Sequence, residues 1–384
     1  MVVYGTRPEA IKVAPLIRAL DESGLFTVQV AVTAQHRTML DQVNDVFGIK
    51  PEFDLDIHSQ GQTLAEITTR ALTGTHALLA GVRPDAVMVQ GDTTTVFAAA
   101  LAAFYEKIPV AHLEAGLRTG NAYSPYPEEI NRQMATRLAA LHLAPTATSK
   151  ANLLAEQVDP ASVVVTGNTV IDALLWTVRQ SSGLGEPRYG DPVLNRLDRD
   201  DAPLLLVTAH RRESWGEPLR AVGRALSRIA GTHPGLRIVL PLHRNPVVRE
   251  AIIPEIAGLP NVIVTEPLPY AGFARLMSRA TVILTDSGGV QEEGPSLGKP
   301  VLVMRDTTER PEAVSAGTVR LVGTGEEQIV AAVGHLLTDI SAYASMANAV
   351  NPYGDGRAAG RAVAALAHFF GLGPPAEEFA GKRR

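Results

Sequence analysis

Short apolar runs alternate along the chain with longer stretches in which apolar positions recur at helical spacing. The runs hold consecutive aliphatic residues without alternation, as expected of parallel strands covered on both faces. They predict strands at 28–32, 86–90, 109–113, 163–166, 204–208, 237–241, 262–264, 282–285 and 301–304. Helices are predicted between them, for example at 63–80, where Thr63 and Glu66 have the spacing of a capping box. Repeated strand–helix–strand units predict an α/β fold with parallel sheets.

The chain is too long for one hydrophobic core, and its pattern predicts two Rossmann-like domains that face a central cleft. The strand–helix pattern weakens over 181–203, which is rich in glycine, proline and charge, and then restarts. We therefore expect an N-terminal domain at 1–168 and a second domain at 169–356. A final helix, within 357–384, is expected to pack back on the first domain.

Composition and charge exclude several classes of protein. Hydrophobic residues make up 46% of the 384 residues and the net charge is −5, which favours folded cores and argues against nucleic acid as a partner. The chain has no cysteine, so disulfides, thiolate metal sites and cysteine nucleophiles are absent. No apolar run reaches the ~20 residues that cross a bilayer, and no signal segment opens the chain. We expect a cytoplasmic protein without a membrane partner.

Polar clusters follow four predicted strands, where an open parallel sheet binds its ligands. They are Gln90-Gly91-Asp92-Thr93-Thr94-Thr95, His112-Leu113-Glu114-Ala115-Gly116-Leu117-Arg118, Thr208-Ala209-His210-Arg211-Arg212-Glu213 and Thr285-Asp286-Ser287-Gly288-Gly289. Each alone is equally well explained as a loop with a helix cap. Four clusters at the same kind of position favour a binding site.

Two segments have the character of anion sites. Ser287, Gly288 and Gly289 precede a predicted helix, whose free amide groups attract phosphate, and Glu292 or Glu293 would then accept hydrogen bonds from ribose. Arg7 and Lys12 both stand near the start of the first helix, where two cations are unfavourable unless an anion lies between them. Plain helix caps and solvated surface charges are the alternatives.

Asp92, Glu114, Glu128 and His210 are the candidate acid–base residues. Carboxylates gathered around one cleft repel one another, which raises the pKa of at least one of them toward neutrality. Glu129 is expected to be a charge at a helix start. The glycine pattern at 354–359 has no strand before it, and no His-Glu-x-x-His motif occurs, so neither a nicotinamide cofactor nor an obligatory metal is expected.

Taken together, these motifs resemble the non-hydrolysing UDP-N-acetylglucosamine 2-epimerases over essentially the whole chain. The resemblance rests on Gly5-Thr6-Arg7-Pro8-Glu9-Ala10, Thr33-Ala34-Gln35-His36-Arg37, Gly91-Asp92-Thr93-Thr94-Thr95, Glu114-Ala115-Gly116-Leu117-Arg118, Pro127-Glu128-Glu129, Thr166-Gly167-Asn168-Thr169, His210-Arg211-Arg212-Glu213, Asp286-Ser287-Gly288-Gly289-Val290-Gln291-Glu292-Glu293, Arg305-Asp306-Thr307-Thr308-Glu309-Arg310-Pro311-Glu312 and Asn351-Pro352-Tyr353-Gly354-Asp355-Gly356. It implies the two-domain fold of GT-B glycosyltransferases, with UDP on the second domain, and usually a homodimer.

The resemblance also implies an activity and a set of site residues. The reaction would be reversible C2 epimerisation of UDP-N-acetylglucosamine to UDP-N-acetylmannosamine, through elimination of UDP to 2-acetamidoglucal and its re-addition, for cell-surface polysaccharides. The substrate-binding residues implied are Arg7, Lys12, Asp92, Glu114, His210, Leu268, Phe273, Ser287, Gly288, Gly289, Glu293 and Arg310; the catalytic residues are Asp92, Glu114, Glu128 and His210.

Two features depart from the family pattern. Only Met1–Tyr4 precedes the first glycine where the family has a longer strand, which predicts a weakened edge of the first sheet. Some bacterial members bind a second substrate molecule as an activator: Gln35, Gln62, Arg211 and His243 match that site, whereas Thr38 and Gly61 do not.

Three alternatives share parts of this pattern. A GT-B glycosyltransferase would have the same fold and nucleotide site but would transfer the sugar to an acceptor. A non-catalytic nucleotide-sugar sensor would not need the acid–base residues. A 2-epimerase of a modified UDP-diacetamido sugar would carry the same motifs.

Overall fold

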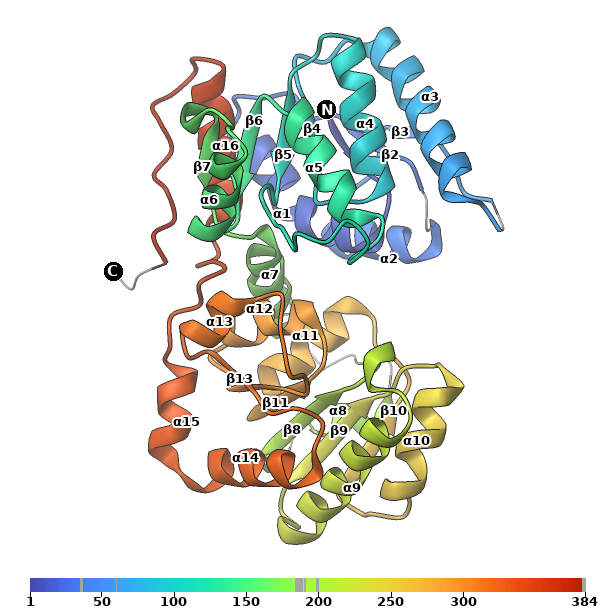
Figure 1. Cartoon of the computed structure of the whole chain (residues 1–384), viewed down its shortest axis with the longest axis vertical. Helices are drawn as coiled ribbons and strands as arrows, with labels where there is room; N and C mark the ends of the chain where they lie inside the picture. The colour runs from blue at the N-terminus through green and yellow to red at the C-terminus, as the bar shows by residue number, and fades with distance from the viewer. Residues whose placement is uncertain (35–36, 60, 184–188, 190, 198–199, 382–384) are drawn as a thin grey trace. The chain divides into compact units, whose positions relative to one another are not determined.

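A computed structural model describes residues 1–34, 37–59, 61–183, 189, 191–197 and 200–381 (Figure 1). In this part of the chain two compact units are present: unit 1 is Met1–Ala173 with Tyr353–Gly381, and unit 2 is Leu174–Pro352. We expected the domain limits at 168/169 and 356/357, and the structure has them a few residues away, at 173/174 and 352/353.

The first turn of helix α7 (Thr169–Gly183) stays with unit 1 because its side chains are buried there. Ile171 is fully buried, and the Asp172 carboxylate accepts hydrogen bonds from the amides of Ala358 and Ala359 at 3.2 and 2.9 Å. These two amides open α16 (Ala358–Phe369), so Asp172 caps the returning helix. Helix α16 packs against α1 (Arg7–Glu22) of the same unit.

Within the described residues, unit 1 contains a parallel sheet in the order β3-β2-β1-β4-β5-β6-β7. Its strands are β1 (Val2–Tyr4), β2 (Val30–Val32), β3 (Phe53–Asp54), β4 (Val87–Gln90), β5 (Val110–Leu113), β6 (Leu141–Ala144) and β7 (Val163–Val165). Strand β1 pairs with both β2 and β4, so it lies inside the sheet. The prediction that the short start weakens a sheet edge is therefore wrong in its location.

Helices cover both faces of this sheet (Figure 1). One row is formed by α3 (Leu64–Val82), α4 (Thr94–Tyr105) and α5 (Glu128–Leu138), which pack side by side. The other row contains α1, α2 (Arg37–Phe47) and α16. Helix α6 (Ala147–Ala155) and a 3₁₀ turn (Pro160–Ser162) lead into β7. The Thr63–Glu66 capping box is confirmed, because each residue bonds the backbone amide of the other.

Unit 2 contains a second parallel sheet, in the order β10-β9-β8-β11-β12-β13 as far as its described residues extend. The strands are β8 (Leu204–Thr208), β9 (Arg237–Pro241), β10 (Val262–Thr265), β11 (Val282–Thr285), β12 (Val301–Val303) and β13 (Val319–Leu321). Its helices are α8 (Pro192–Leu197), α9 (Glu217–Thr232), α10 (Pro246–Ile256), α11 (Tyr270–Arg279), α12 (Gly288–Ser296), α13 (Pro311–Ser315), α14 (Glu326–Thr338) and α15 (Ile340–Ala347), with a 3₁₀ turn at Arg212–Ser214.

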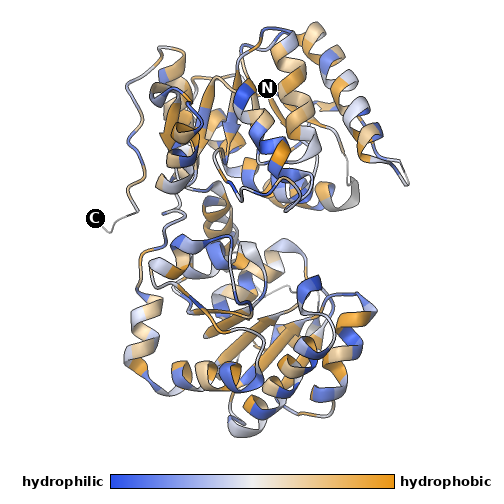
Figure 2. Ribbon diagram, viewed as in Figure 1, coloured by the Kyte–Doolittle hydropathy of each residue, from blue (hydrophilic) through white to orange (hydrophobic). Residues whose placement is uncertain are grey.

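The apolar core of unit 2 lies between its strands and the helices α9, α10 and α14. Figure 2 shows the same distribution in both units: strands are mostly apolar, whereas helices carry both apolar and polar residues. This is the expected consequence of covering a parallel sheet on both faces. In the part of the chain that is described, no single helix combines the length and apolar character of a membrane span; α14 and α15 do so only as a pair bent by 95°.

The predicted strands are confirmed to within about two residues, and among the described residues three further strands, β3, β6 and β13, escaped prediction. Strand β3 has only two residues, and β6 and β13 are interrupted by His142 and Arg320. A short run with a polar residue inside has no clear strand signal. In each sheet the order in which successive strands are added reverses between two neighbouring strands, β1 and β4 in unit 1 and β8 and β11 in unit 2. Loops that follow these strands flank the usual ligand position.

Candidate active site

The two loops at the switch point of unit 1 are tied together by one buried carboxylate. Glu9 is 1% exposed; one of its oxygens accepts hydrogen bonds from the amides of Gly5 and Thr6, and the other accepts one from the Thr93 hydroxyl at 2.8 Å. Burial raises the pKa of Glu9 although these donors oppose it. A side chain at Gly5 would lie 2.1 Å from the Thr33 hydroxyl, so the close approach requires glycine.

The expected anion near Lys12 is a carboxylate of the protein. The Lys12 ammonium bonds both oxygens of Glu114, at 2.6 and 2.7 Å. Gln90 and Asn168 also donate side-chain hydrogen bonds to Glu114, which is 9% exposed and has a φ of 65°. Arg7 differs from Lys12, because it is exposed and has no ion-pair partner within the described ranges. Arg7 is thus the cation of this loop that can meet an external anion.

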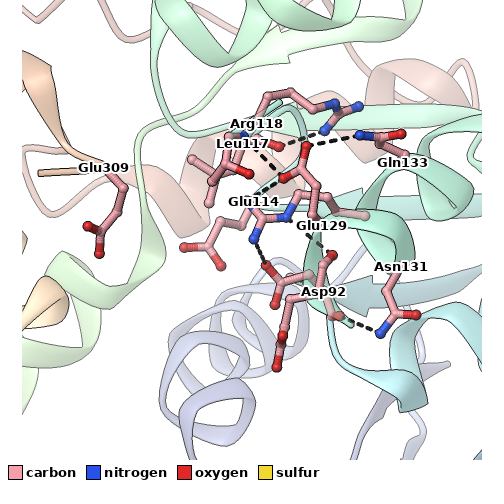
Figure 3. Close-up of polar contacts among 12 residues, drawn as sticks. Asp92, Glu114, Leu117, Arg118, Glu129, Asn131, Gln133 and Glu309 are labelled. Atoms are coloured by element: carbon pink, nitrogen blue, oxygen red, sulfur yellow. Dashed lines mark hydrogen bonds and ion pairs between the residues drawn. The ribbon is translucent and has the colours of Figure 1, made fainter. Parts of the chain in front are cut away.

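Asp92 follows β4 and is held by the second turn of α5 (Figure 3). Its carboxylate forms a 2.9 Å ion pair with Arg132, and its carbonyl accepts a 3.0 Å hydrogen bond from the Asn131 side chain. Burial raises the pKa of Asp92 to about 6, against the opposing effect of Arg132 and with the help of the nearby Glu114 charge. A carboxyl with this pKa exchanges protons readily near neutral pH.

Two neighbouring glutamates at the start of α5 have different surroundings. Glu128 is half-buried and begins the helix, whereas the Glu129 side chain is fully buried. Glu129 accepts hydrogen bonds from the amides of Thr119 and Gly120 and from Gln133 at 2.9 Å, as Figure 3 shows in part. Glu129 thus fixes the loop that precedes the helix, a larger role than the expected charge at a helix start.

A buried histidine contacts the backbone of the loop that carries Asp92. His112, fully buried in β5, has its Nε2 atom 2.7 Å from the Gly91 carbonyl oxygen. Burial lowers the pKa of His112 to about 4, so the ring is neutral at pH 7. The nitrogen that faces a carbonyl must carry the proton, which fixes the tautomer and the position of Gly91.

In unit 2 the switch point holds His210 and α12. The His210 Nδ1 atom lies 2.9 Å from Asp286, whose other oxygen accepts hydrogen bonds from the amides of His210 and Arg211. Burial raises the pKa of Asp286, but these hydrogen bonds outweigh it and hold the pKa below its usual value. An ionised Asp286 keeps the proton on Nδ1, which leaves Nε2 of the half-exposed ring for a ligand.

The amino end of α12 is packed against an arginine. A methyl group placed on Gly288 would lie 2.6 Å from Arg310 Nη1 and 2.9 Å from Glu309 Oε1, so only glycine permits this contact. Arg310 also forms a 2.6 Å ion pair with Glu292, so the Glu292 carboxylate is a partner of this arginine. Burial raises the pKa of Glu309, yet Arg310 and Arg305 together lower it to about 2. Helix amides and arginines make this a site for an anion.

The remaining expected residues of unit 2 lie at the same edge of its sheet. Leu268 follows β10, Phe273 lies in the first turn of α11, and both are half-buried. Glu293 is 8% exposed, and its charge adds to burial in raising the pKa of the nearby Tyr270. Ser287 caps α12, and its amide donates to the Thr285 hydroxyl at 2.9 Å.

The structure joins some predicted residues by direct contacts and adds others that the sequence analysis did not select. Lys12 with Glu114 and Gly288 with Arg310 are brought together. Arg132 and Asn131 were missed because they lie in a helix without a motif of their own, and Asp286 was part of a predicted cluster but was given no role. Of the four expected regulatory residues, Gln35 lies outside the described residues, and the His243 ring stacks on His210 with centroids 6.0 Å apart. No cluster of three or more potential metal ligands occurs among the residues described.

Comparison with known proteins links this arrangement to one family. A sequence model of the family described as UDP-N-acetylglucosamine 2-epimerase matches residues 18–367. The UDP-N-acetylglucosamine 2-epimerase of Escherichia coli K12 is 53% identical over 366 residues, 95% of this chain and 97% of that protein. The enzyme of that name from Bacillus subtilis 168 is 53% identical over 371 residues, 97% of this chain and 95% of that protein.

Solved structures give the same result. The UDP-GlcNAc 2-epimerase of Neisseria meningitidis, bound to UDP-GlcNAc, has a TM-score of 0.86 and 48% identity, over 96% of this chain and 99% of that one. The S. aureus protein MnaA, solved with UDP, has a TM-score of 0.84 and 43% identity, over 99% of each chain. These similarities confirm the predicted GT-B-like class of two Rossmann-like α/β domains with parallel sheets.

Proposed function

Because the chain belongs to the UDP-N-acetylglucosamine 2-epimerase family, we propose that it interconverts UDP-N-acetylglucosamine and UDP-N-acetylmannosamine by inverting C2 of the sugar. The observation that carries the proposal is the surroundings of Asp92. This carboxyl has a pKa of about 6 and stands at the switch point of unit 1, close enough to Glu114 and Glu128 to feel their charges. Inversion at a carbon requires proton transfer on both faces, and these carboxyl groups are suited to it.

The C2 hydrogen lies next to no carbonyl group, so its removal alone would leave an unstabilised carbanion. We propose that one carboxylate removes the C2 proton while the C1–O bond breaks and its electron pair leaves with UDP. The C2–H electron pair then forms the C1–C2 double bond of 2-acetamidoglucal. In the second half, UDP adds back to C1, and an acid on the opposite face gives a proton to C2.

The departing diphosphate needs positive charge and hydrogen-bond donors. Arg310 and the amide groups at the start of α12 provide them in unit 2, and Arg7 is an exposed cation of the first loop of unit 1. His210 offers Nε2 to a phosphate oxygen and can move a proton there, because Asp286 holds its Nδ1. Phe273 packs near uracil, Leu268 contacts the base through its backbone, and Glu293 accepts hydrogen bonds from ribose.

Incubation of the protein with UDP-N-acetylglucosamine in heavy water tests the proposal. We expect UDP-N-acetylmannosamine with deuterium at C2, without added nicotinamide, as measured by NMR. Product without deuterium would exclude proton exchange with solvent and with it the elimination route. Product only in the presence of an acceptor would instead favour a glycosyltransferase. Turnover of a diacetamido analogue alone would move the substrate to a modified sugar.

The expected homodimer and the activating second substrate molecule belong to the same proposal. His210 and His243 are stacked, which supports communication between the catalytic histidine and one residue of the expected regulatory site. Light scattering measures the oligomeric state. Sigmoidal dependence of the initial rate on substrate concentration is the expected signature of the activator.

A further inference from the structure

The Asp92 carboxylate is surrounded by charges from three elements. Glu114 follows β5, Glu128 begins α5, and Lys12 lies on α1; the fourth charged group is Arg132 of α5. The two glutamates and burial favour the protonated form of Asp92. A proton acceptor must be ionised before it can act, so the cations that face Asp92 decide whether it can.

Lys12 forms its ion pair with Glu114. Its ammonium bonds both oxygens of Glu114 at 2.6 and 2.7 Å, whereas Arg132 Nη2 lies 2.9 Å from Asp92 Oδ2. The Arg132 side chain is only 9% exposed, so solvent screens this ion pair weakly. Arg132 is therefore the principal cation of Asp92.

The orientation of Arg132 is fixed by the start of its own helix. Its Nε donates a 3.3 Å hydrogen bond to the Glu128 carbonyl, and its Nη1 lies 3.7 Å from Glu129. The adjacent Asn131 side chain donates to the Asp92 carbonyl at 3.0 Å. One turn of α5 thus holds the backbone and the carboxylate of Asp92 with the same helix end that presents Glu128.

From this geometry we propose that Arg132 is a positioning residue that keeps the Asp92 carboxylate ionised and aligned with Glu128. The inference rests on the proposed function, since it assigns Asp92 the work of a proton acceptor. It extends that function to a residue that does not itself transfer a proton. A purely structural Arg132 would tie α5 to the Asp92 loop without altering the titration of Asp92.

Direct titration of Asp92 separates the two roles. Protein labelled with ¹³C at the aspartate carboxyl carbons is titrated by NMR, and the Asp92 signal is assigned by its absence from Asp92→Asn. In Arg132→Gln we expect the Asp92 midpoint to rise by about one pH unit or more, because the opposing cation is lost. Arg132→Lys keeps the charge and should leave the midpoint within about half a unit of the native value.

A matched control lies on the same helix. Arg137 is exposed in the last turn of α5, so Arg137→Gln removes the same charge from the chain without touching Asp92. We expect its Asp92 midpoint to be unchanged. An unchanged midpoint in Arg132→Gln as well, or an equal rise in Arg137→Gln, would overturn the inference.

Turnover provides the second readout. The acidic side of the pH profile of kcat/KM should shift to higher pH in Arg132→Gln. For a shift of about one unit, this variant loses about fivefold more activity at pH 6 than at pH 8 relative to the native protein. If Arg132→Gln does not fold, Arg132→Lys and the double variant Asp92→Asn/Arg132→Gln carry the test. The double variant should turn over as slowly as Asp92→Asn alone, and a further loss beyond about threefold would contradict the proposal.

The two readouts fail independently. A native protein that converts no UDP-N-acetylglucosamine would refute the proposed function, and the titration of Asp92 would still decide what Arg132 does. A native protein that epimerises while the Asp92 midpoint ignores Arg132 would refute the inference alone.

Discussion

The two units build their ligand edges on the same topology but treat carboxyl groups in opposite ways. In unit 1, burial dominates at Glu9, Asp92 and Asp172 and raises their pKa values, although at the neighbouring Glu129 burial is outweighed by hydrogen bonds, which lower its pKa. In unit 2, cations and amides dominate, and the pKa values of Asp286 and Glu309 are lowered. The first arrangement favours proton exchange and the second favours binding of an anion.

The difference arises from how the cations are shared. In the unit 1 cluster the shortest ion pairs match one cation to one carboxylate, Lys12 to Glu114 and Arg132 to Asp92, and Arg132 lies farther, at 3.7 Å, from Glu129. In unit 2 three arginines, Arg211, Arg305 and Arg310, all approach Glu309. The two units have the same kind of fold, so the fold does not explain why their carboxyl groups differ in pKa. We attribute this difference to the ratio of arginines to carboxylates at the edge of each sheet.

The largest expected effect is in unit 1. Asp92→Asn keeps the size of the side chain and removes its ability to take up a proton, so turnover should fall by about 10²–10⁴-fold. Affinity for UDP, measured by calorimetry, should change by less than about threefold because Asp92 lies in the unit that handles protons. Asp85→Asn, an exposed carboxylate ahead of β4, is the control. Loss of UDP binding in Asp92→Asn would break the comparison.

The matching change in unit 2 should weaken binding. Gly288→Ala places a methyl group 2.6 Å from Arg310 Nη1 and pushes that guanidinium away from the start of α12. Loss of one charge-assisted contact predicts roughly ten- to hundredfold weaker binding of UDP. Gly231→Ala, at a helical glycine with open space around it, should bind as the native protein does. Equal affinity in both variants would show that Arg310 does not contact the nucleotide.

The smallest effect concerns stability. Burial raises the pKa of Asp172 to about 6, so between about pH 4 and pH 6 the folded state holds a proton that the unfolded state has lost. The free energy of unfolding therefore falls as the pH rises through this window, by at most about 3 kcal/mol from this group. Asp172→Asn should remove that part of the slope in urea unfolding followed by circular dichroism.

Asp355 is the matched opposite in the same unit. Two hydrogen bonds from Arg361, at 2.8 and 2.7 Å, lower its pKa, so its contribution is present at neutral pH and is lost as the pH falls through the lowered value. Asp355→Asn should lower stability at pH 7 and leave it nearly unchanged at low pH. The same slope in both variants would show that burial does not control the titration of Asp172.

The fold followed from the sequence where the signal is local and repeated. Long apolar runs such as 204–208 and 282–285 predicted strands at their observed positions, and the helix predicted at 63–80 is observed as α3. The motif residues Asp92, His210 and Ser287 were placed after strands correctly, because strand ends can be read from the sequence. The interior position of β1 could not, since pairing is decided by partners far along the chain.

By itself the sequence determined the class of fold, the family and the set of polar residues at the strand ends, because periodicity and motifs are local properties of the chain. Only the tertiary structure decided which charges meet: Glu114 neutralises Lys12, Arg132 faces Asp92, and Arg310 rests on Gly288. These pairings set the pKa values on which the proposed chemistry depends. They join residues up to 102 positions apart, and no spacing along a chain encodes a contact of that range.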